Sequence, residues 1–172
     1  MKKLVRRIKN LIWIMLLLLI VIGVKTNSIM ITKGSTIDDI EFSLQMKLQS
    51  DYALLYDYNY ITLKGYSLVF PKIFDISTNK LPTFKGTEVE VVQQCIDFVN
   101  ESTYSKNDSD PNGVLKKGVG NCQAMSLILH SILDKHNIEN ELTLTEDHMS
   151  NELIVNGTKY LVDLANNIIQ KE

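Results

Sequence analysis

Gly118-Val119-Gly120-Asn121-Cys122 is the most informative segment of this chain, because a strongly apolar run over residues 123–129 follows it directly. Glycines let a loop approach other backbone closely, and the apolar run is typical of a buried helix. We therefore expect the Cys122 thiol at the first turn of a helix. The N-terminus of a helix favours negative charge, so a cysteine there is biased towards the thiolate, which is its reactive form.

The predicted helix that starts near Cys122 is expected to be central and largely buried. Its small and apolar residues cover a broad face, at Ala124, Leu127, Ile128, Ser131 and Ile132. The helix is expected to end at His136-Asn137, because asparagine adopts the left-handed conformation that stops a helix.

Strands are predicted after this helix, over residues 141–145, 151–155 and 158–162. The last two are joined by Asn156-Gly157, the strongest short signal for a β-hairpin. A two-residue turn there pairs Val155 with Thr158, and this register puts His148 and Asp163 on one face of the sheet as diagonal neighbours. Diagonal Cβ atoms are roughly 7–8 Å apart, which an imidazole and a carboxylate together bridge.

Cys122, His148 and Asp163 together have the composition of a catalytic triad for thiol chemistry. Cys122 is the expected nucleophile, His148 the general base and acid, and Asp163 the group that orients the imidazole. The backbone N–H of Cys122 is a first donor to the oxyanion, and the second donor is expected upstream, from Gln93 or Tyr104.

Residues 118–163 resemble the core of the transglutaminase-like superfamily of cysteine enzymes. The matching segments are Gly120-Asn121-Cys122-Gln123-Ala124, His148, and residues 156–163, which end in Asp163. The resemblance implies a papain-like α+β domain in which the cysteine helix packs on an antiparallel sheet. It also implies acyl transfer through a thioester without a cofactor. The aromatic residue usual after the histidine is replaced here by Met149-Ser150.

Upstream of the cysteine, the chain gives local signals only. A helix is expected after Ser35/Thr36, with Ile37, Ile40, Leu44 and Leu48 on one face, and short β-structure is expected around residues 58–64 and 67–70, separated by Gly65. Pro71 and Pro82 bracket a stretch for which we predict no structure. Thr87 and Glu90 form a capping box for a helix that runs to about Asn100, and residues 105–113 are expected to be a polar loop.

The N-terminus predicts a membrane anchor. Five basic residues lie within residues 1–9, and residues 11–24 form an apolar run that Lys25 closes. We expect a cytoplasmic segment at 1–9, a single transmembrane signal-anchor at 10–25, a spacer at 26–34 and a transglutaminase-like domain at 35–172. The positive-inside rule places that domain outside the cell. A cleaved signal peptide and a buried soluble helix are the alternatives, since about 20 residues are needed for a full span.

Charge limits the partners of the chain. All 20 Asp/Glu follow residue 25, where only 12 Lys/Arg oppose them, so this acidic part is not expected to bind nucleic acid. The two cysteines, Cys95 and Cys122, are too few for a disulfide scaffold, although a single bond between them is formally possible outside the cell. No metal-ligand spacing is present. Cys95, His130 and His136 are interpreted as structural, and 108–110 as a solvated loop.

The leading functional hypothesis is a membrane-anchored thiol enzyme that acts outside the cell on a peptide or protein substrate, by hydrolysis or by transglutamination. The alternative is a catalytically inactive transglutaminase-like module that binds a cell-surface protein or polymer. A third hypothesis is a structural anchor domain of a larger envelope assembly. The Cys/His/Asp set favours the enzyme, and the missing aromatic residue after His148 keeps the binding module open.

Overall fold

The computed structural model describes residues 2–25, 29–33, 53–145 and 147–172. The chain divides into two compact units, Met1–Ile73 and Phe74–Glu172. The predicted domain over residues 35–172 therefore takes in part of unit 1 as well as all of unit 2, which carries the cysteine helix.

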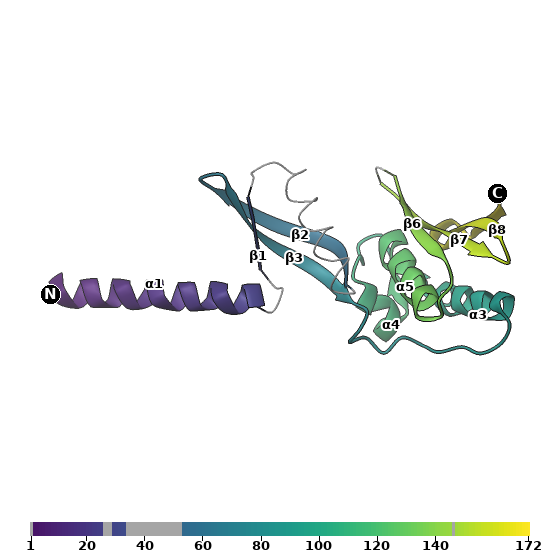
Figure 1. Cartoon of the computed structure of the whole chain (residues 1–172), viewed down its shortest axis with the longest axis horizontal. Coiled ribbons are helices and arrows are strands. Elements are labelled where there is room, and N and C mark those ends of the chain that lie inside the picture. Colours follow the sequence, from purple (N-terminus) through teal and green to yellow (C-terminus); the bar gives the residue numbers. More distant parts are fainter. Residues whose placement is uncertain (1, 26–28, 34–52, 146) are drawn as a thin grey trace. The chain divides into compact units, whose positions relative to one another are not determined.

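The described residues of unit 1 form the helix α1 (Lys2–Lys25) and the strands β1 (Met30–Lys33), β2 (Ala53–Leu63) and β3 (Tyr66–Asp75), the last running on into unit 2. The strands form a sheet in the order β1-β3-β2 (Figure 1). Lys64 and Gly65 turn the β2–β3 hairpin with φ of 52° and 81°. The predicted β-structure around Gly65 is confirmed, and both strands are longer than expected. β3 also passes through Pro71, in the stretch for which nothing was predicted.

Helix α1 covers the predicted anchor at residues 10–25. Across the described part of the chain, however, no helix combines the length and the apolar character needed to cross a membrane, so the predicted span is not supported. Its apolar run, residues 11–24, is shorter than the roughly 20 residues that span a bilayer. The helix predicted after Ser35/Thr36 lies outside the described residues.

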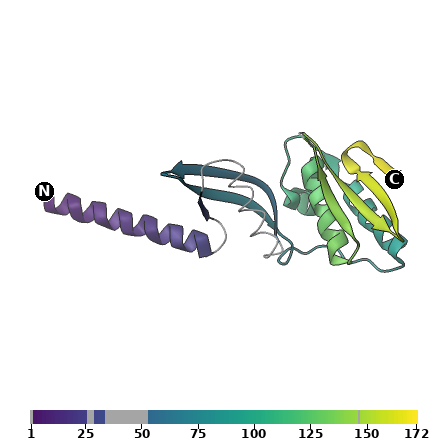
Figure 2. The ribbon, with the colours of Figure 1, turned by 45° about the horizontal axis from the view of Figure 1, so that its top comes forward.

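Unit 2 is a mixed helix and sheet structure, as expected for the α+β class. Its helices are α3 (Glu88–Asn100), α4 (Pro111–Lys117), α5 (Cys122–Lys135) and the 3-10 helix η1 (Leu164–Asn166); its strands are β4 (Thr103–Tyr104), β5 (Val119–Gly120), β6 (Asn140–Leu144), β7 (Met149–Val155), β8 (Thr158–Asp163) and β9 (Ile168–Lys171). The antiparallel sheet has the order β6-β7-β8-β9, and α3 and α5 pack on one face of it (Figure 2).

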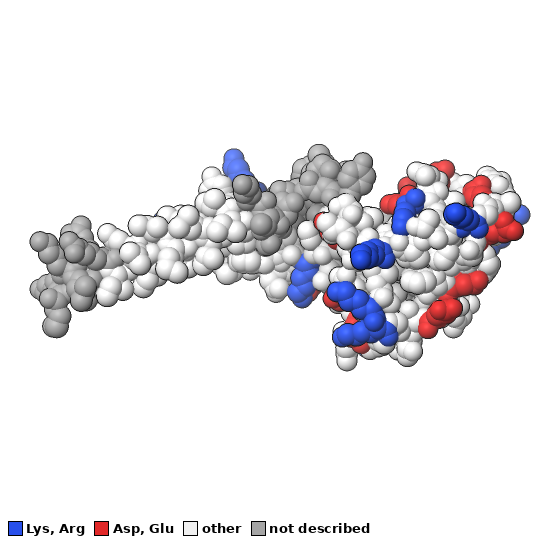
Figure 3. Space-filling view, turned by 90° about the horizontal axis from the view of Figure 1, so that it is seen from below, with Lys and Arg blue, Asp and Glu red and all other residues white. Residues whose placement is uncertain are grey.

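Helix α5 is the centre of the core. Nine of its residues are buried, and Ala124, Ile128, Leu129 and Ile132 are fully enclosed. It ends at Lys135, and Asn137 takes a left-handed φ of 57°, as the sequence predicted. Lys/Arg and Asp/Glu are interspersed on the face of unit 2 that Figure 3 shows, around this apolar core.

The predicted start of α3 is confirmed in detail. The Thr87 hydroxyl accepts a hydrogen bond from the N–H of Glu90, and the Glu90 carboxylate accepts one from the N–H of Thr87 at 2.7 Å. The bond from the Thr87 backbone lowers the pKa of Glu90. Two otherwise unpaired donors of the first turn are thereby satisfied, and the helix runs to Asn100.

The prediction of a polar loop over residues 105–113 is wrong for its last three residues. Helix α4 begins at Pro111, and the side chain of Asp110 caps it by accepting the N–H of Asn112 at 2.9 Å. Proline is favoured at the first position of a helix, where its missing N–H costs nothing, so Asp110-Pro111 is a helix start rather than a turn.

The predicted hairpin is confirmed, including its register. Asn156 and Gly157 have φ of 50° and 74°, as a tight turn with two left-handed residues requires. Val155 pairs with Thr158, and Asn151 pairs with Val162. Residues 149–163 therefore form the β7–β8 hairpin of the sheet that packs on the cysteine helix, and β9 extends this sheet by a strand that was not predicted.

Candidate active site

Cys122 is the first residue of α5 and is partly exposed. The helix is capped by Asn121, whose side-chain oxygen accepts the N–H of Ala124 at 2.9 Å. A Cβ at Gly120 would lie 2.6 Å from a methyl carbon of Val114. A glycine is therefore needed just before the cysteine, but the close contact is with a side chain of α4 and not with other backbone as expected.

Two further contacts fix the start of β7 beside the first turns of α5. The Ser126 hydroxyl donates to the carbonyl of Met149 at 3.0 Å, and the Asn151 amide donates to the carbonyl of Ser126 at 3.0 Å. Ser126 lies one turn after Cys122. The residues at the start of β7, including His148 just before it, are thereby brought to the cysteine end of the helix.

His148 and Asp163 are hydrogen-bonded to each other. The Nε2 atom of His148 lies 2.8 Å from Oδ2 of Asp163. The predicted diagonal placement of these two residues across the hairpin is thus confirmed, while their roles stay predictions. The backbone of His148 is also held, since its carbonyl accepts the N–H of Thr145 at 2.9 Å.

Asn166 is a residue of the site that the sequence reasoning missed. Its side-chain amide donates to Oδ2 of Asp163 at 2.8 Å, and its backbone N–H donates to Oδ1 at 3.3 Å. Burial alone would raise the pKa of Asp163, but the hydrogen bonds from Asn166 and His148 outweigh it and lower that pKa. Asp163 caps the short helix η1. An aspartate followed three residues later by a polar side chain is a capping pattern that could have revealed the contact.

Cys122 and His148 line one cavity of about 250 Å³. The other lining residues are Asn121, Gln123, Leu144, Thr145, Asp147 and Met149. Within the described structure, Nδ1 of His148 takes part in no hydrogen bond, whereas Nε2 is bound to Asp163. The cavity therefore holds a thiol, an imidazole with one nitrogen unengaged, and apolar walls from Leu144 and Met149.

The two predicted oxyanion donors lie in different places. Gln93 faces an apolar cavity between α3 and the sheet, beside Ile96 and Ile169, and its amide donates to Asp97 at 2.8 Å. Tyr104 lies on β4, which runs parallel to β5 and pairs Tyr104 with Gly120. The structure thus brings Tyr104, and not Gln93, to the loop that precedes Cys122.

Cys95, His130 and His136, which were interpreted from the sequence as structural, lie in contacts that fit this interpretation. Cys95 is fully buried in α3, and burial raises the pKa of its thiol to about 11. Both cysteines are free, so the disulfide left open above is not formed. His130 contacts Asn140 and Asp134, and Nε2 of His136 accepts the N–H of Phe84 at 3.2 Å.

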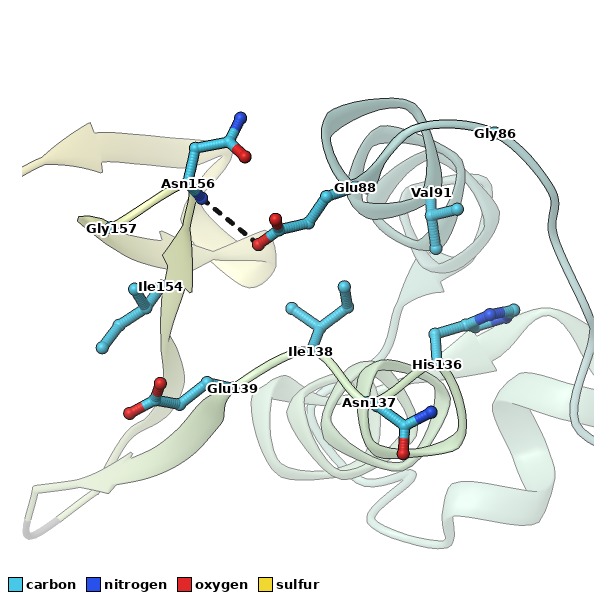
Figure 4. Close-up of a pocket in the computed structure, with 10 residues that line it drawn as sticks. All are labelled: Gly86, Glu88, Val91, His136, Asn137, Ile138, Glu139, Ile154, Asn156 and Gly157. Atoms are coloured by element: carbon cyan, nitrogen blue, oxygen red, sulfur yellow. Dashed lines mark hydrogen bonds between the residues drawn. The ribbon is translucent and has the colours of Figure 1, made fainter.

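A larger cavity of about 610 Å³ lies at the opposite end of α5, around His136 (Figure 4). There the Glu88 carboxylate accepts the N–H of Asn156 at 3.2 Å and ties the hairpin turn to α3. None of the described residues that line it carries a thiol or a hydroxyl. Among the described residues, no group of three His, Cys, Asp or Glu is placed to hold a metal ion.

Comparison with known proteins gives a distant likeness only. No family model matches the chain, and no curated protein matches it. One solved structure, of a transglutaminase (TGase), is 9% identical and covers 73% of this chain at a TM-score of 0.35. A second, of a "putative protease" from Parabacteroides distasonis ATCC 8503, is 12% identical and covers 70% of this chain at a TM-score of 0.37.

This chain spans 48% and 41% of the lengths of those two proteins. At TM-scores below 0.5, the likeness carries no argument about the chemistry of this chain.

Proposed function

We propose that unit 2 is a thiol acyl-transfer enzyme that hydrolyses a peptide or amide bond, with Cys122 as nucleophile. The observation that carries the proposal is the 2.8 Å hydrogen bond between His148 and Asp163, at a cavity that Cys122 also lines. A nucleophile, a base and a group that orients the base are the elements of triad chemistry.

The hydrogen bond assigns the two nitrogens of His148. Because Nε2 faces the carboxylate, Nδ1 is the nitrogen that exchanges protons with the thiol. In the first half-reaction Cys122 Sγ bonds to the carbonyl carbon, its proton passes to Nδ1, and Nδ1 then protonates the departing amine. In the second, water gives a proton to Nδ1 and attacks the thioester, and the acid leaves as Cys122 regains its proton.

The oxyanion of the tetrahedral intermediate needs donors near Cys122. The backbone N–H of Cys122 belongs to the first turn of α5, where no carbonyl within the helix accepts it. Of the two predicted side-chain donors we retain Tyr104, because its strand pairs with the loop that carries the cysteine. If an amine instead of water attacks the thioester, the enzyme is a transglutaminase, which is the second outcome that the assay must distinguish.

Iodoacetamide labelling tests the thiol, and a peptide library tests the turnover. Cys122 should label at neutral pH at least about tenfold faster than a free cysteine peptide, and His148→Ala should remove that excess. Cys95, which is fully buried, is the internal control and should label only after unfolding. The peptide library is scored for both ammonia release and cleavage. If Cys122 labels like a free thiol and no peptide is turned over, the inactive binding module becomes the better hypothesis.

The proposal includes a location outside the cell. Its support is the charge asymmetry, since all six Lys/Arg of residues 1–25 are unopposed by acid and all 20 Asp/Glu follow. A tag on the C-terminus, probed by antibody in intact spheroplasts, should be accessible without lysis. A tag that is detected only after lysis would place unit 2 in the cytoplasm.

A further inference from the structure

Strand β6 is an edge of the antiparallel sheet of unit 2. The sheet has the order β6-β7-β8-β9, so among the described residues β6 pairs on one side only, with β7. Leu144 pairs with Met149, which puts these two side chains on the same face, and both line the cavity that holds Cys122. One end of the open edge therefore lies at the candidate nucleophile.

The register shows which backbone groups of β6 point outwards. The N–H of Thr145 donates to the carbonyl of His148, and the N–H of Ile154 donates to the carbonyl of Glu139, both at 2.9 Å. Bonded and non-bonded pairs alternate along an antiparallel ladder. The odd-numbered residues of β6 thus bond to β7, and the N–H and C=O of Leu142 and Leu144 point to the open edge.

Leu144 is unusual for an edge residue. The residue is 70% exposed, more than any other large apolar residue described in this chain. Proteins usually protect an exposed apolar edge strand, because its free N–H and C=O groups pair readily with another extended chain. Here the exposed leucine lies beside Cys122, which suggests that the edge is kept open for a ligand.

We propose that the substrate binds as an added, extended strand on the open edge of β6, paired with the backbone of Leu144, with an apolar side chain against Leu144 and Met149. The inference depends on the proposed function and names its substrate class, an extended peptide. Added strands obtain affinity from backbone hydrogen bonds and specificity from alternate side chains. The exposed carboxylates of Glu141 and Asp147 further favour a neutral or basic peptide over an acidic one.

Protection of Cys122 from iodoacetamide by acetyl-Leu-Leu-Leu-aldehyde tests the inference. The thiol adds reversibly to the aldehyde carbon, the thiol proton goes to the new hydroxyl, and the hemithioacetal blocks labelling. Hexanal, which has no peptide backbone, is the reference for thiol addition alone. For each variant, the labelling rate of Cys122 with aldehyde is divided by its rate without aldehyde, so differences in the reactivity of the thiol towards iodoacetamide cancel.

Two substitutions at one position separate the backbone from the side chain. Leu144→Ala and Leu144→Pro both remove the leucine side chain, but only proline lacks the outward N–H. Proline is tolerated where the N–H of an edge strand faces solvent. We expect Leu144→Pro to need about tenfold more peptide aldehyde than Leu144→Ala for half-protection, and the two to respond equally to hexanal.

The opposite edge of the sheet offers a matched control. The N–H of Glu172 donates to the carbonyl of Lys159, so on β9 the odd-numbered residues point outwards, including Ile169, which is 55% exposed. The peptide aldehyde should protect Cys122 equally in Ile169→Pro and Ile169→Ala. The inference would be overturned if the peptide aldehyde protected Cys122 equally in Leu144→Pro and Leu144→Ala. It would also be overturned if iodoacetamide labelled Cys122 of the wild type and the peptide aldehyde gave no protection.

If Leu144→Pro fails to fold, as thermal unfolding will show, the wild-type protein is tested with peptide aldehydes methylated at each backbone nitrogen in turn. Methylation of at least one backbone nitrogen should weaken protection of Cys122 about tenfold. If none of the methylated peptides protects less well, strand pairing is contradicted. Failure of the proposed function looks different, because Cys122 then labels like a free thiol whether or not peptide is present.

Discussion

A cavity lies at each end of helix α5 and is lined by a histidine, His148 at one end and His136 at the other, yet only one end has the means for chemistry. At the C-terminal end the cavity is larger, about 610 Å³ against about 250 Å³. There Nε2 of His136 accepts the N–H of Phe84 and the ring stacks on Phe84. At the N-terminal end Nε2 of His148 faces a carboxylate and Nδ1 is unengaged within the described structure. The hydrogen bonds of the imidazole, rather than the size of the cavity, distinguish the two ends.

Removing the thiol should have the largest effect. Cys122→Ala should lower peptide turnover by about 10⁴-fold or more, because Cys122 carries the one thiol among the described residues that line the cavity. Stability should change little, since alanine is a good helix former at this partly exposed position. Kinetics with the peptide from the library and thermal unfolding measure both. Normal turnover in this variant would remove the N-terminal end of α5 as the site.

Substitution of His148 should have the next largest effect on turnover, and substitution of His136 almost none. His148→Ala should lower turnover by about 10²–10⁴-fold, the usual contribution of a general base. Adding it to Cys122→Ala should cause almost no further loss, because the members of a triad act as a unit. The matched control is His136→Ala, with His130→Ala beside it. If either control were inactive while His148→Ala kept its activity, the distinction between the two ends would be reversed.

Asp163→Asn should be milder. The imidazole remains present but loses the carboxylate that orients it, so the loss should be roughly ten- to a hundredfold smaller than for His148→Ala. The measurement is kcat at saturating peptide, with KM as the check that substrate binding is intact. A loss confined to KM would assign Asp163 to substrate binding instead.

Asn166→Ala should act through Asp163 and cost activity only about three- to tenfold. Its amide helps to hold the pKa of Asp163 below the usual value of about 3.9. A carboxyl whose pKa is lowered by folding stabilises the protein above its unfolded pKa, and that contribution is lost as the pH falls through the folded pKa. The stability difference between wild type and Asn166→Ala should therefore be full above about pH 4 and disappear in stronger acid.

Unfolding by urea between pH 2 and 7 measures that difference. Asn166→Asp is the comparison, since it replaces the donor by a second carboxylate beside Asp163. A stability difference that is independent of pH would mean that Asn166 serves packing at η1 and does not position Asp163.

The smallest effect on catalysis is expected at the far end of α5. His136→Ala should leave turnover within about twofold but lower the free energy of unfolding by about 1–3 kcal/mol, because the N–H of Phe84 loses its acceptor and Phe84 loses its stacking partner. Urea unfolding and the peptide assay, run on the same preparation, separate the two quantities. Unchanged stability would show that this end of the helix is looser than its contacts indicate.

Local interactions explain what the sequence predicted correctly. The capping box at Thr87, the left-handed Asn137 and the Asn156-Gly157 turn each involve residues a few positions apart, so the short pattern contains the whole interaction. The same holds for the placement of His148 against Asp163. Once a two-residue turn fixes the register, the alternation of side chains in a strand leaves one arrangement.

The features that the sequence left out involve packing between distant segments or competition between two local signals. Asp110-Pro111 carries both turn and helix-start character, and the packing of α4 against α5 favoured the helix. Strand β9 pairs with a β8 that is already formed, and its own four residues carry too short a pattern to predict it. Gln93 lies on the helix that was predicted for it, whereas no element was predicted at Tyr104. Only the pairing of β4 with β5 shows that Tyr104 lies at the cysteine loop.

The cysteine helix, the hairpin, and the register that faces His148 towards Asp163 could be predicted from the sequence, because each follows from the periodicity and turn chemistry of a continuous segment. Three features could be seen only in the folded chain: Cys122 shares a cavity with His148, Asn166 holds Asp163, and in the described residues β6 ends the sheet with an open edge at Leu144. These arrangements depend on which strand lies at the edge and which helix lies beneath it. That choice follows from burying the apolar surfaces of the whole unit, and no single segment contains it.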